Sequence, residues 1–343
     1  DSPIKNWAGS NVDFNPKKTA SINPDNLIAH EFSKYHCYSC PVGCGGLCNI
    51  PGQEGDTHKP EYETILALGG LLMNDDLPSL FEMNEALNRA GLDSISVGGA
   101  IAFAIESFEA GVLSLEDTGG IELRWGDTTA IKALMEKIIK REGIGALLAD
   151  GTKKAAEAIG KGSEAYAMHA GGQEPAMHDG RLDPGFALHY AVEATPGRHT
   201  IGSQLYYEMY QLWRKSDKVP KSPALFFPKD DRYKADEYLA GMATASTQFK
   251  MVIDAAGLCI FGSFIGVHRI PIFEWLNAAT GWQKCPNEYL EMGRQIASLR
   301  QAFNEKQGAA LRHKMNPRLY GDPPLTEGAN KGRTVRLDEL VTL

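Results

Sequence analysis

The sequence predicts an all-α, multihelical fold built from two related helical domains with long functional loops. Apolar residues recur at helical spacing through most of the chain, which indicates amphipathic helices. The alternation of apolar and polar residues that is typical of strands is scarce. A six-residue motif also occurs twice, about half a chain apart and each time at the end of an expected helix, which indicates an internal repeat.

The elements follow in order from composition and periodicity. Residues 1–30 are polar and are expected to form an extended lead-in, and residues 37–60 are rich in glycine and proline and are expected to form a loop. Helices are expected over 61–72, 80–90, 99–111, 128–143, 144–160, 206–215, 234–254 and 287–307. Residues 163–185 are predicted to be a linker or active-site segment, residues 216–232 an irregular insertion, and the tail after Asn316 polar and proline-rich.

Composition restricts the class of protein. The 343 residues are 43% hydrophobic and 23% charged, which is typical of folded globular proteins. No run of eighteen apolar residues predicts a membrane span, and the first twenty residues lack the apolar core of a signal peptide. The net charge of −8 argues against nucleic acid or an anionic membrane as a partner. These features predict a cytoplasmic protein.

Four of the six cysteines lie within twelve residues, which favours metal binding in a reducing compartment over a disulfide framework. Cys37, Cys40 and Cys44 bring three thiols onto one short glycine-rich stretch, and three close thiolates with a distant fourth are typical of an iron–sulfur cluster. Zinc and disulfides are the alternatives. The candidate fourth ligands are Cys48, Cys259 and Cys285, and spacing alone favours Cys259 only modestly.

The repeated motif is NRAGLD at residues 88–93 and DAAGLC at residues 254–259, with its two copies 166 residues apart. A single copy is adequately explained as a plain helix end with a buried leucine. Two copies in matching context predict two related halves, which we place at residues 1–168 and 169–343.

These residues together resemble the aldehyde:ferredoxin oxidoreductase family. The resemblance rests on HCYSCPVGC, EYETILALGG, NRAGLDSISVGG, DAAGLC and the late segment AFNEKQGAALRHKMNPRLYGDPP. It implies a tungsten enzyme with a bis-pyranopterin cofactor and one 4Fe–4S cluster. It extends to the two helical C-terminal domains of the family, whereas the N-terminal β-rich domain that supports the pterins is absent from this sequence. The resemblance therefore implies the C-terminal part or subunit of such an enzyme, with that domain as a partner.

The resemblance also implies roles for particular residues. The cluster ligands would be Cys37, Cys40, Cys44 and Cys259, which leaves Cys48 and Cys285 unassigned. The pterin-binding residues would be Asn88, Gly91, Leu92 and Asp93 in the first motif and Asp254, Gly257 and Leu258 in the second. A carboxylate can accept both parallel N–H donors of a pterin edge, so Asn88 in place of the first aspartate is a departure that changes or weakens that pairing.

Two catalytic residues are implied in the same way. Glu63 resembles the glutamate proposed to activate a water, with Glu61 close enough to compete for the assignment. His199 resembles the histidine thought to hydrogen-bond the substrate carbonyl, with His169, His178 and His189 as alternatives. Five loop residues are expected to face the pocket or a domain interface: His58, Glu174, His178, Asp179 and Arg181. The sequence contains no ExxH motif, so a metal-bridged dimer of the kind found in some relatives is not expected.

The leading functional hypothesis is oxidation of a small aldehyde to a carboxylate. Tungsten, or molybdenum, would take the electrons, and the cluster would pass them to a ferredoxin-like acceptor. Two alternatives stay open: a subunit of a low-potential aryl-CoA reductase of the benzoyl-CoA type, and a non-catalytic iron–sulfur electron-transfer subunit.

Overall fold

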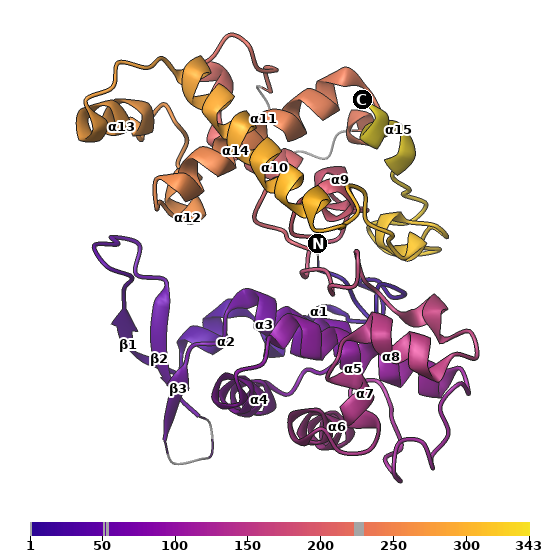
Figure 1. The fold of residues 1–343 in the computed structure, drawn as a ribbon. Helices are drawn as coiled ribbons and strands as arrows, with labels where there is room; N and C mark the ends of the chain where they lie inside the picture. Colours follow the sequence, from indigo (N-terminus) through magenta and orange to yellow (C-terminus); the bar gives the residue numbers. More distant parts are fainter. Residues whose placement is uncertain (1, 51, 53–54, 223–229) are drawn as a thin grey trace. The chain divides into compact units, whose positions relative to one another are not determined.

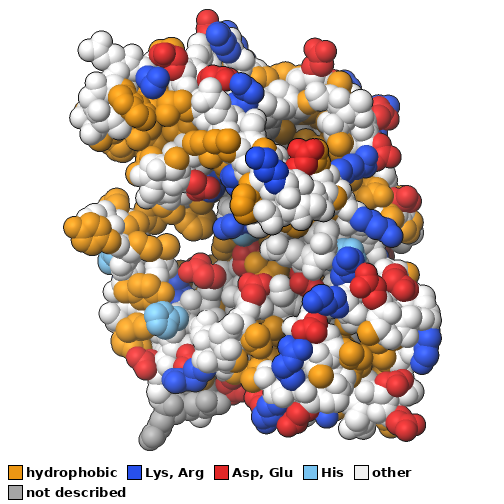
Figure 2. Space-filling model, viewed as in Figure 1, with side chains coloured by type: hydrophobic (Ala, Val, Ile, Leu, Met, Phe, Trp, Pro, Cys, Tyr) orange, Lys and Arg blue, Asp and Glu red, His pale blue; other side chains and the backbone are white. Residues whose placement is uncertain are grey.

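The computed structural model describes residues 2–50, 52, 55–222 and 230–343, and these form two compact units (Figure 1). Unit 1 comprises residues 1–179 with two later segments, 316–319 and 323–332. Unit 2 comprises residues 180–315 with 320–322 and 333–343. Both units are built mainly from helices, so the predicted multihelical fold class is confirmed. Acidic and basic side chains are interspersed over the face of each unit seen in Figure 2.

Unit 1 is organised around α5 (Ser94–Glu109), whose residues from Val97 to Ile105 are all buried. A Cβ added to Gly98 would lie 2.6 Å from the Ala67 carbonyl oxygen, so this glycine allows α5 to pack closely on α3. The other helices of this unit are α1 (Pro16–Ser21), α2 (Pro24–Ile28), α3 (Tyr62–Leu68), α4 (Leu77–Ala90), α6 (Thr128–Lys140), α7 (Ile144–Leu148) and α8 (Thr152–Ile159), with 3-10 turns at Gly70–Leu72, Ser163–Tyr166 and Pro317–Tyr320.

A three-stranded antiparallel sheet projects from unit 1, in the order β1 (Glu31–Tyr35), β2 (Gly45–Asn49), β3 (Asp56–His58). The expectation of a loop over residues 37–60 was therefore wrong for β2 and β3. Two glycines of β2 explain the difference, since a Cβ on Gly45 would lie 2.4 Å from the Tyr35 ring and one on Gly46 would lie 2.5 Å from Glu31. These glycines make room for side chains of the neighbouring strand.

The N-terminal segment also differs from the extended lead-in that we expected. It contains α1 and α2, each of which begins with a proline after an asparagine cap. The Asn15 side chain accepts hydrogen bonds from two backbone amides of the first turn, and Asn23 accepts one. Trp7 and Phe14 are buried, which anchors the segment in the core.

Unit 2 is organised around two long helices, α11 (Glu237–Ala255) and α14 (Pro286–Lys306). They meet where a Cβ on Gly293 would lie 1.9 Å from the Gln248 carbonyl oxygen. Shorter helices surround them: α9 (Pro184–Val192), α10 (Gln204–Tyr210), α12 (Ile260–Ser263), α13 (Ile272–Thr280) and α15 (Leu337–Thr342), with 3-10 turns at Leu212–Arg214 and Asp230–Tyr233. Part of the insertion predicted over residues 216–232 lies outside the described residues.

The helix expected over residues 144–160 is two helices, α7 and α8. They are separated at Gly151, whose φ of 90° is incompatible with a continuous right-handed helix. Among the described residues no single helix is long and apolar enough to span a membrane. The pair α4 and α5 reaches that length and hydropathy only jointly, and the two helices are bent by 115° to each other.

The packing of α11 on α14 gives a first testable prediction. Gly293→Ala should destabilise the protein by about 3 kcal/mol, because the added methyl group overlaps a backbone oxygen that cannot move without shifting α11. The measurement is the urea unfolding midpoint. Gly262→Ala is the matched control, since its Cβ would meet nothing within 4 Å. Equal midpoints for the two variants would contradict this account of the packing.

Candidate functional site

Glu63 is a buried carboxylate in the first turn of α3, with only 7% of the residue exposed. Its Oε2 accepts a hydrogen bond of 2.7 Å from the backbone N–H of Met177. The first turn of a helix also favours negative charge, because the peptide dipoles point their positive ends there. The carboxylate is therefore oriented by a backbone amide from a segment 114 residues away in unit 1.

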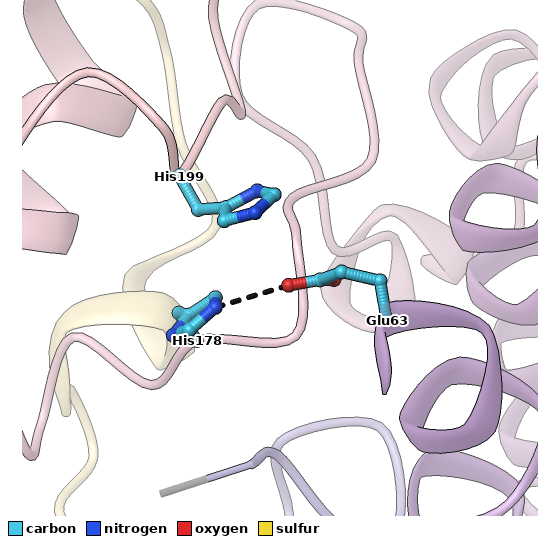
Figure 3. A group of neighbouring side chains, drawn as sticks. All are labelled: Glu63, His178 and His199. Carbon is cyan, nitrogen blue, oxygen red and sulfur yellow. Dashed lines mark ion pairs between the residues drawn. The ribbon is translucent and has the colours of Figure 1, made fainter. Parts of the chain in front are cut away.

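The second oxygen of this carboxylate faces a histidine. His178 Nε2 lies 3.0 Å from Glu63 Oε1, and Figure 3 shows the ring and the carboxylate pointing toward each other. The same nitrogen lies 3.2 Å from the Tyr62 hydroxyl, and the two rings meet edge to face at a centroid distance of 5.8 Å. One ring nitrogen thus lies within reach of an acid and a phenol, of which the ionised carboxylate can only accept a hydrogen bond whereas the hydroxyl can donate or accept.

The structure distinguishes between the two glutamates that the sequence left in competition. Glu61 is exposed, and it precedes α3 without making a side-chain capping bond. Glu63, two residues later, points into the protein. Tyr62 and the Met177 amide were not predicted as part of this site. Tyr62 lies within the EYET motif that contains both glutamates, so the sequence could have indicated it. The Met177 amide is 114 residues away from Glu63, and no sequence pattern indicates it.

The other predicted loop residues lie in several environments. Glu174 is buried, and its Oε1 accepts a 2.6 Å hydrogen bond from the Thr152 amide at the start of α8, which is a structural role. His58 is exposed on β3, where its Nδ1 lies 2.9 Å from the Tyr35 hydroxyl. Asp179 and Arg181 are both buried.

Unit 2 carries the predicted catalytic histidine and one of its competitors. His199 lies half-buried in the segment between α9 and α10, and Figure 3 also labels it. His189 is buried within α9, with Nδ1 2.7 Å from the Gly185 carbonyl oxygen and Nε2 2.9 Å from the Thr247 hydroxyl. Burial lowers the pKa of His189, so this ring is held neutral as a structural group.

The loop between β1 and β2 carries three of the predicted cluster ligands. Cys37 and Cys44 are exposed and Cys40 is half-buried, and all three are free thiols. The His36 ring donates from Nδ1 to the Cys40 carbonyl oxygen at 3.0 Å, which fixes the turn. Gly43 has a φ of +59°, and a Cβ there would lie 2.4 Å from the His36 ring. The hairpin therefore presents its thiols outward from a defined backbone.

The remaining cysteines differ in their surroundings. Cys48 lies on β2 with no exposed surface, and burial raises the pKa of its thiol, which disfavours the thiolate that a metal requires. Cys285 caps α14, in a capping box with Glu288. Cys259 is exposed at the start of α12 and makes no capping hydrogen bond. Its assignment as the fourth ligand stays a prediction.

The two repeated motifs adopt the same backbone arrangement. In the first, the Leu92 amide bonds to the Leu87 carbonyl and Gly91 has a φ of +68°. In the second, the Leu258 amide bonds to the Ile253 carbonyl and Gly257 also has a φ of +68°. Both are helix ends of the Schellman type. Asp93 is the N-cap of α5 and accepts a 2.8 Å hydrogen bond from the Ser96 amide.

The donor groups and the space around them fit the implied cofactors. Three free thiols on one loop, two of them exposed, are a suitable donor set for an iron–sulfur cluster. A Cβ on Gly91 or Gly257 would meet nothing within 4 Å, so both helix ends border open space. The predicted pterin-binding residues Asn88 and Asp254 are exposed at these same ends.

Comparison with known proteins shows the family to which the chain belongs. The family model described as aldehyde ferredoxin oxidoreductase, domains 2 and 3, matches residues 1–343. The chain belongs to this family.

Particular relatives extend the comparison. The chain is 36% identical over 307 residues to the tungsten-containing aldehyde ferredoxin oxidoreductase of Pyrococcus furiosus, covering 89% of this chain and 48% of that protein. It is 27% identical over 361 residues to the aliphatic sulfonate oxidoreductase, WOR-like subunit, of the same organism, covering 98% and 50%. The chain thus spans about half the length of the curated relatives it matches.

A solved structure shares the fold. This is the active site complex BamBC of benzoyl coenzyme A reductase, in complex with 1,5-dienoyl-CoA. It matches with a TM-score of 0.64 and 21% identity, over 91% of this chain and 50% of that one. At this identity the likeness establishes the fold alone.

The cysteine hairpin gives a second prediction. Cys40→Ser should remove most of the iron from the anaerobically purified protein, because the cluster would lose one of three ligands on its loop. Cys48→Ala should keep its iron, since that thiol is buried. The measurements are iron per chain and the visible thiolate-to-iron absorption. Unchanged iron in Cys40→Ser, or loss in Cys48→Ala, would contradict the ligand assignment.

His189 gives a third prediction, which concerns stability. Its folded-state pKa is lowered, so the unfolded chain binds a proton more readily below about pH 6.5 and the free energy of unfolding falls as the pH drops. His189→Gln should remove a part of this slope, at most about 1.4 kcal/mol per pH unit. Urea unfolding between pH 7 and pH 5 measures it, with the exposed His58→Gln as control. Parallel slopes for wild type and His189→Gln would refute the assignment.

Proposed function

We propose that this chain is the helical, catalytic part of a tungsten–pterin aldehyde oxidoreductase that converts aldehydes to carboxylates. Its electrons would leave through a 4Fe–4S cluster to ferredoxin or a similar acceptor. The observation that carries the proposal is the buried Glu63, which is fixed by the Met177 amide and faces His178 at 3.0 Å. A carboxylate held beside a histidine in this way is suited to accept a proton, which is a function that an electron-transfer subunit does not require.

The residues that would hold the cofactors follow from the helix ends and the hairpin. Cys37, Cys40, Cys44 and Cys259 would bind the cluster. The ends of α4 and α11 would bind the pterins through the two motifs: Asn88, Gly91, Leu92, Asp93, Asp254, Gly257 and Leu258. When bound, the tungsten centre supplies the two-electron acceptor and the cluster supplies one-electron transfer. The names of the relatives support tungsten, and metal analysis would distinguish it from molybdenum.

The protein's own part in the reaction concerns protons and charge. Oxidation of an aldehyde with water yields a carboxylate and releases protons, so a base is required. Glu63 would accept a proton from the attacking water through the oxygen that faces His178. His178 would then orient that carboxylate and share the proton, with Tyr62 as the second partner of its Nε2. His199 would donate a hydrogen bond to the carbonyl oxygen as negative charge develops there.

The partners follow from the extent of the chain. Because the chain spans about half of its relatives, we propose that the pterin-supporting N-terminal domain completes the enzyme, either in the same polypeptide or as a subunit. A small aldehyde would be the substrate. We further propose a cytoplasmic, anaerobic setting, where free thiols and a low-potential cluster are compatible.

The decisive experiment is anaerobic purification of the native assembly, followed by metal and pterin analysis and a dye-linked substrate panel. We expect about four irons, one tungsten and two pterins per chain, with activity on aldehydes. Iron without tungsten, molybdenum or pterin would instead identify an electron-transfer subunit, and zinc alone would overturn the cluster. Activity on aryl-CoA thioesters or aliphatic sulfonates, but not aldehydes, would place the chain with the relatives that carry those names.

The role of Glu63 gives a fourth prediction. Glu63→Gln should lower kcat by about a hundredfold or more while metal and pterin content stay unchanged, because an amide cannot accept the proton. Glu61→Gln is the matched control and should leave kcat within about twofold, since that side chain is exposed. Steady-state kinetics with an aldehyde and a dye acceptor measure both. Normal turnover in Glu63→Gln would refute its role as the base.

A further inference from the structure

A lysine is buried beside the predicted pterin-binding aspartate of unit 2. Lys250 lies inside α11 with 6% of the residue exposed, and its ammonium donates to Asp254 Oδ1 one helical turn later. A buried ammonium is unfavourable unless it is paired. Among the described residues, Asp254 is the only acid that forms an ion pair with Lys250, and this pairing offsets the cost of burying the ammonium.

The aspartate itself lies where a helix disfavours it. Asp254 is the penultimate residue of α11, and the carboxyl end of a helix carries partial negative charge. Its side chain is 49% exposed, and among the described residues its second oxygen, Oδ2, has no hydrogen-bond donor. Lys250 thus keeps a negative group at an unfavourable position, with one oxygen left available to a ligand.

The repeated motif in unit 1 provides an internal comparison. Asn88 occupies the place of Asp254 at the end of α4, and Asn84 occupies the place of Lys250 four residues earlier. Asn84 turns away, donating to the His58 carbonyl oxygen at 2.9 Å and to the Thr57 hydroxyl at 3.3 Å. The charged pair of α11 is therefore matched by a neutral pair in α4, so the charge is not required by the helix end itself.

Aromatic side chains pack around Phe249, the residue of α11 that precedes Lys250. Tyr210 is fully buried and packs on Phe249 at 4.9 Å and on Phe264 at 5.8 Å, between ring centroids. Its hydroxyl has no hydrogen-bond partner among the described residues. Burial raises the pKa of the Tyr210 hydroxyl, and the nearby Tyr206 and Asp254 add to the effect.

We propose that Lys250 is a positioning residue that fixes the orientation of the Asp254 side chain, so that Oδ2 accepts the N–H edge of a pterin-type heterocycle at the end of α11. The corresponding end of α4 offers only the neutral amide of Asn88. The two helix ends would therefore bind their heterocycles with different strength, and the α11 end would be the tighter one. This inference rests on the proposed function, since it requires that a pterin binds at all.

The test compares cofactor retention in the complete native assembly. Lys250→Met removes the charge but keeps the length of the side chain, and Lys250→Arg restores the charge. The double variant Lys250→Asn, Asp254→Asn reproduces the neutral pair of α4 and leaves no charge buried alone. Lys153→Met is the matched control, because it removes another lysine paired with an acid four residues later, in exposed positions.

The readouts are pterin per chain, the rate of pterin release during dialysis, iron per chain and the thermal unfolding midpoint. We expect pterin release to accelerate about tenfold in Lys250→Met and in the double variant, with iron unchanged. Lys250→Arg and Lys153→Met should retain pterin like the wild type. Since the double variant has no unpaired charge, it keeps the test valid if Lys250→Met folds poorly.

Two outcomes would overturn the inference, and a separate one concerns the proposed function. Wild-type retention of pterin in the double variant would show that the charged pair does not hold the cofactor. Equal loss in Lys250→Arg and Lys250→Met would show that the packing of the lysine, not its charge, is responsible. Absence of pterin from the wild-type assembly would instead refute the proposed function, independently of Lys250.

Discussion

The position of one buried carboxylate constrains much of unit 1. Glu63 needs donors, because an uncompensated buried charge would cost more than the unit could tolerate. Those donors come from Met177 and His178, in a segment without regular secondary structure. Glu174, in the same segment, is fixed in turn by the Thr152 amide. Two buried acids thus help to hold this loop in one conformation.

The same reasoning bears on the function proposed for Glu63. A glutamate that served only to tie a loop to a helix could be replaced by an apolar contact of similar volume, often without loss of stability. A carboxylate that must accept a proton cannot be replaced in this way. The Glu63–His178 pair therefore constrains the loop and also contains two groups that can exchange a proton. The His178 ring is within reach of the Tyr62 hydroxyl as well.

The sequence predicted the long helices well, because α5, α11 and α14 carry many turns of apolar periodicity. It missed short helices such as α12 and α15, whose few residues give no measurable period. It also missed β2, because the glycines that suggested a loop are required by packing against Tyr35 and Glu31. In the site, Glu63 was singled out through the family resemblance and its role stays a prediction, whereas the Met177 amide depends on tertiary packing that no local pattern records.

In the two repeated motifs, the same backbone position carries residues of different chemistry. The residue that follows glycine and leucine begins the next helix in both motifs. In unit 1 this is Asp93, whose side chain is used to cap the sixteen-residue α5 through the Ser96 amide. In unit 2 it is Cys259, which makes no such bond, and α12 is only four residues long. A short helix loses little without a cap. The thiol of Cys259 is therefore available to a metal at a position where its counterpart serves the fold.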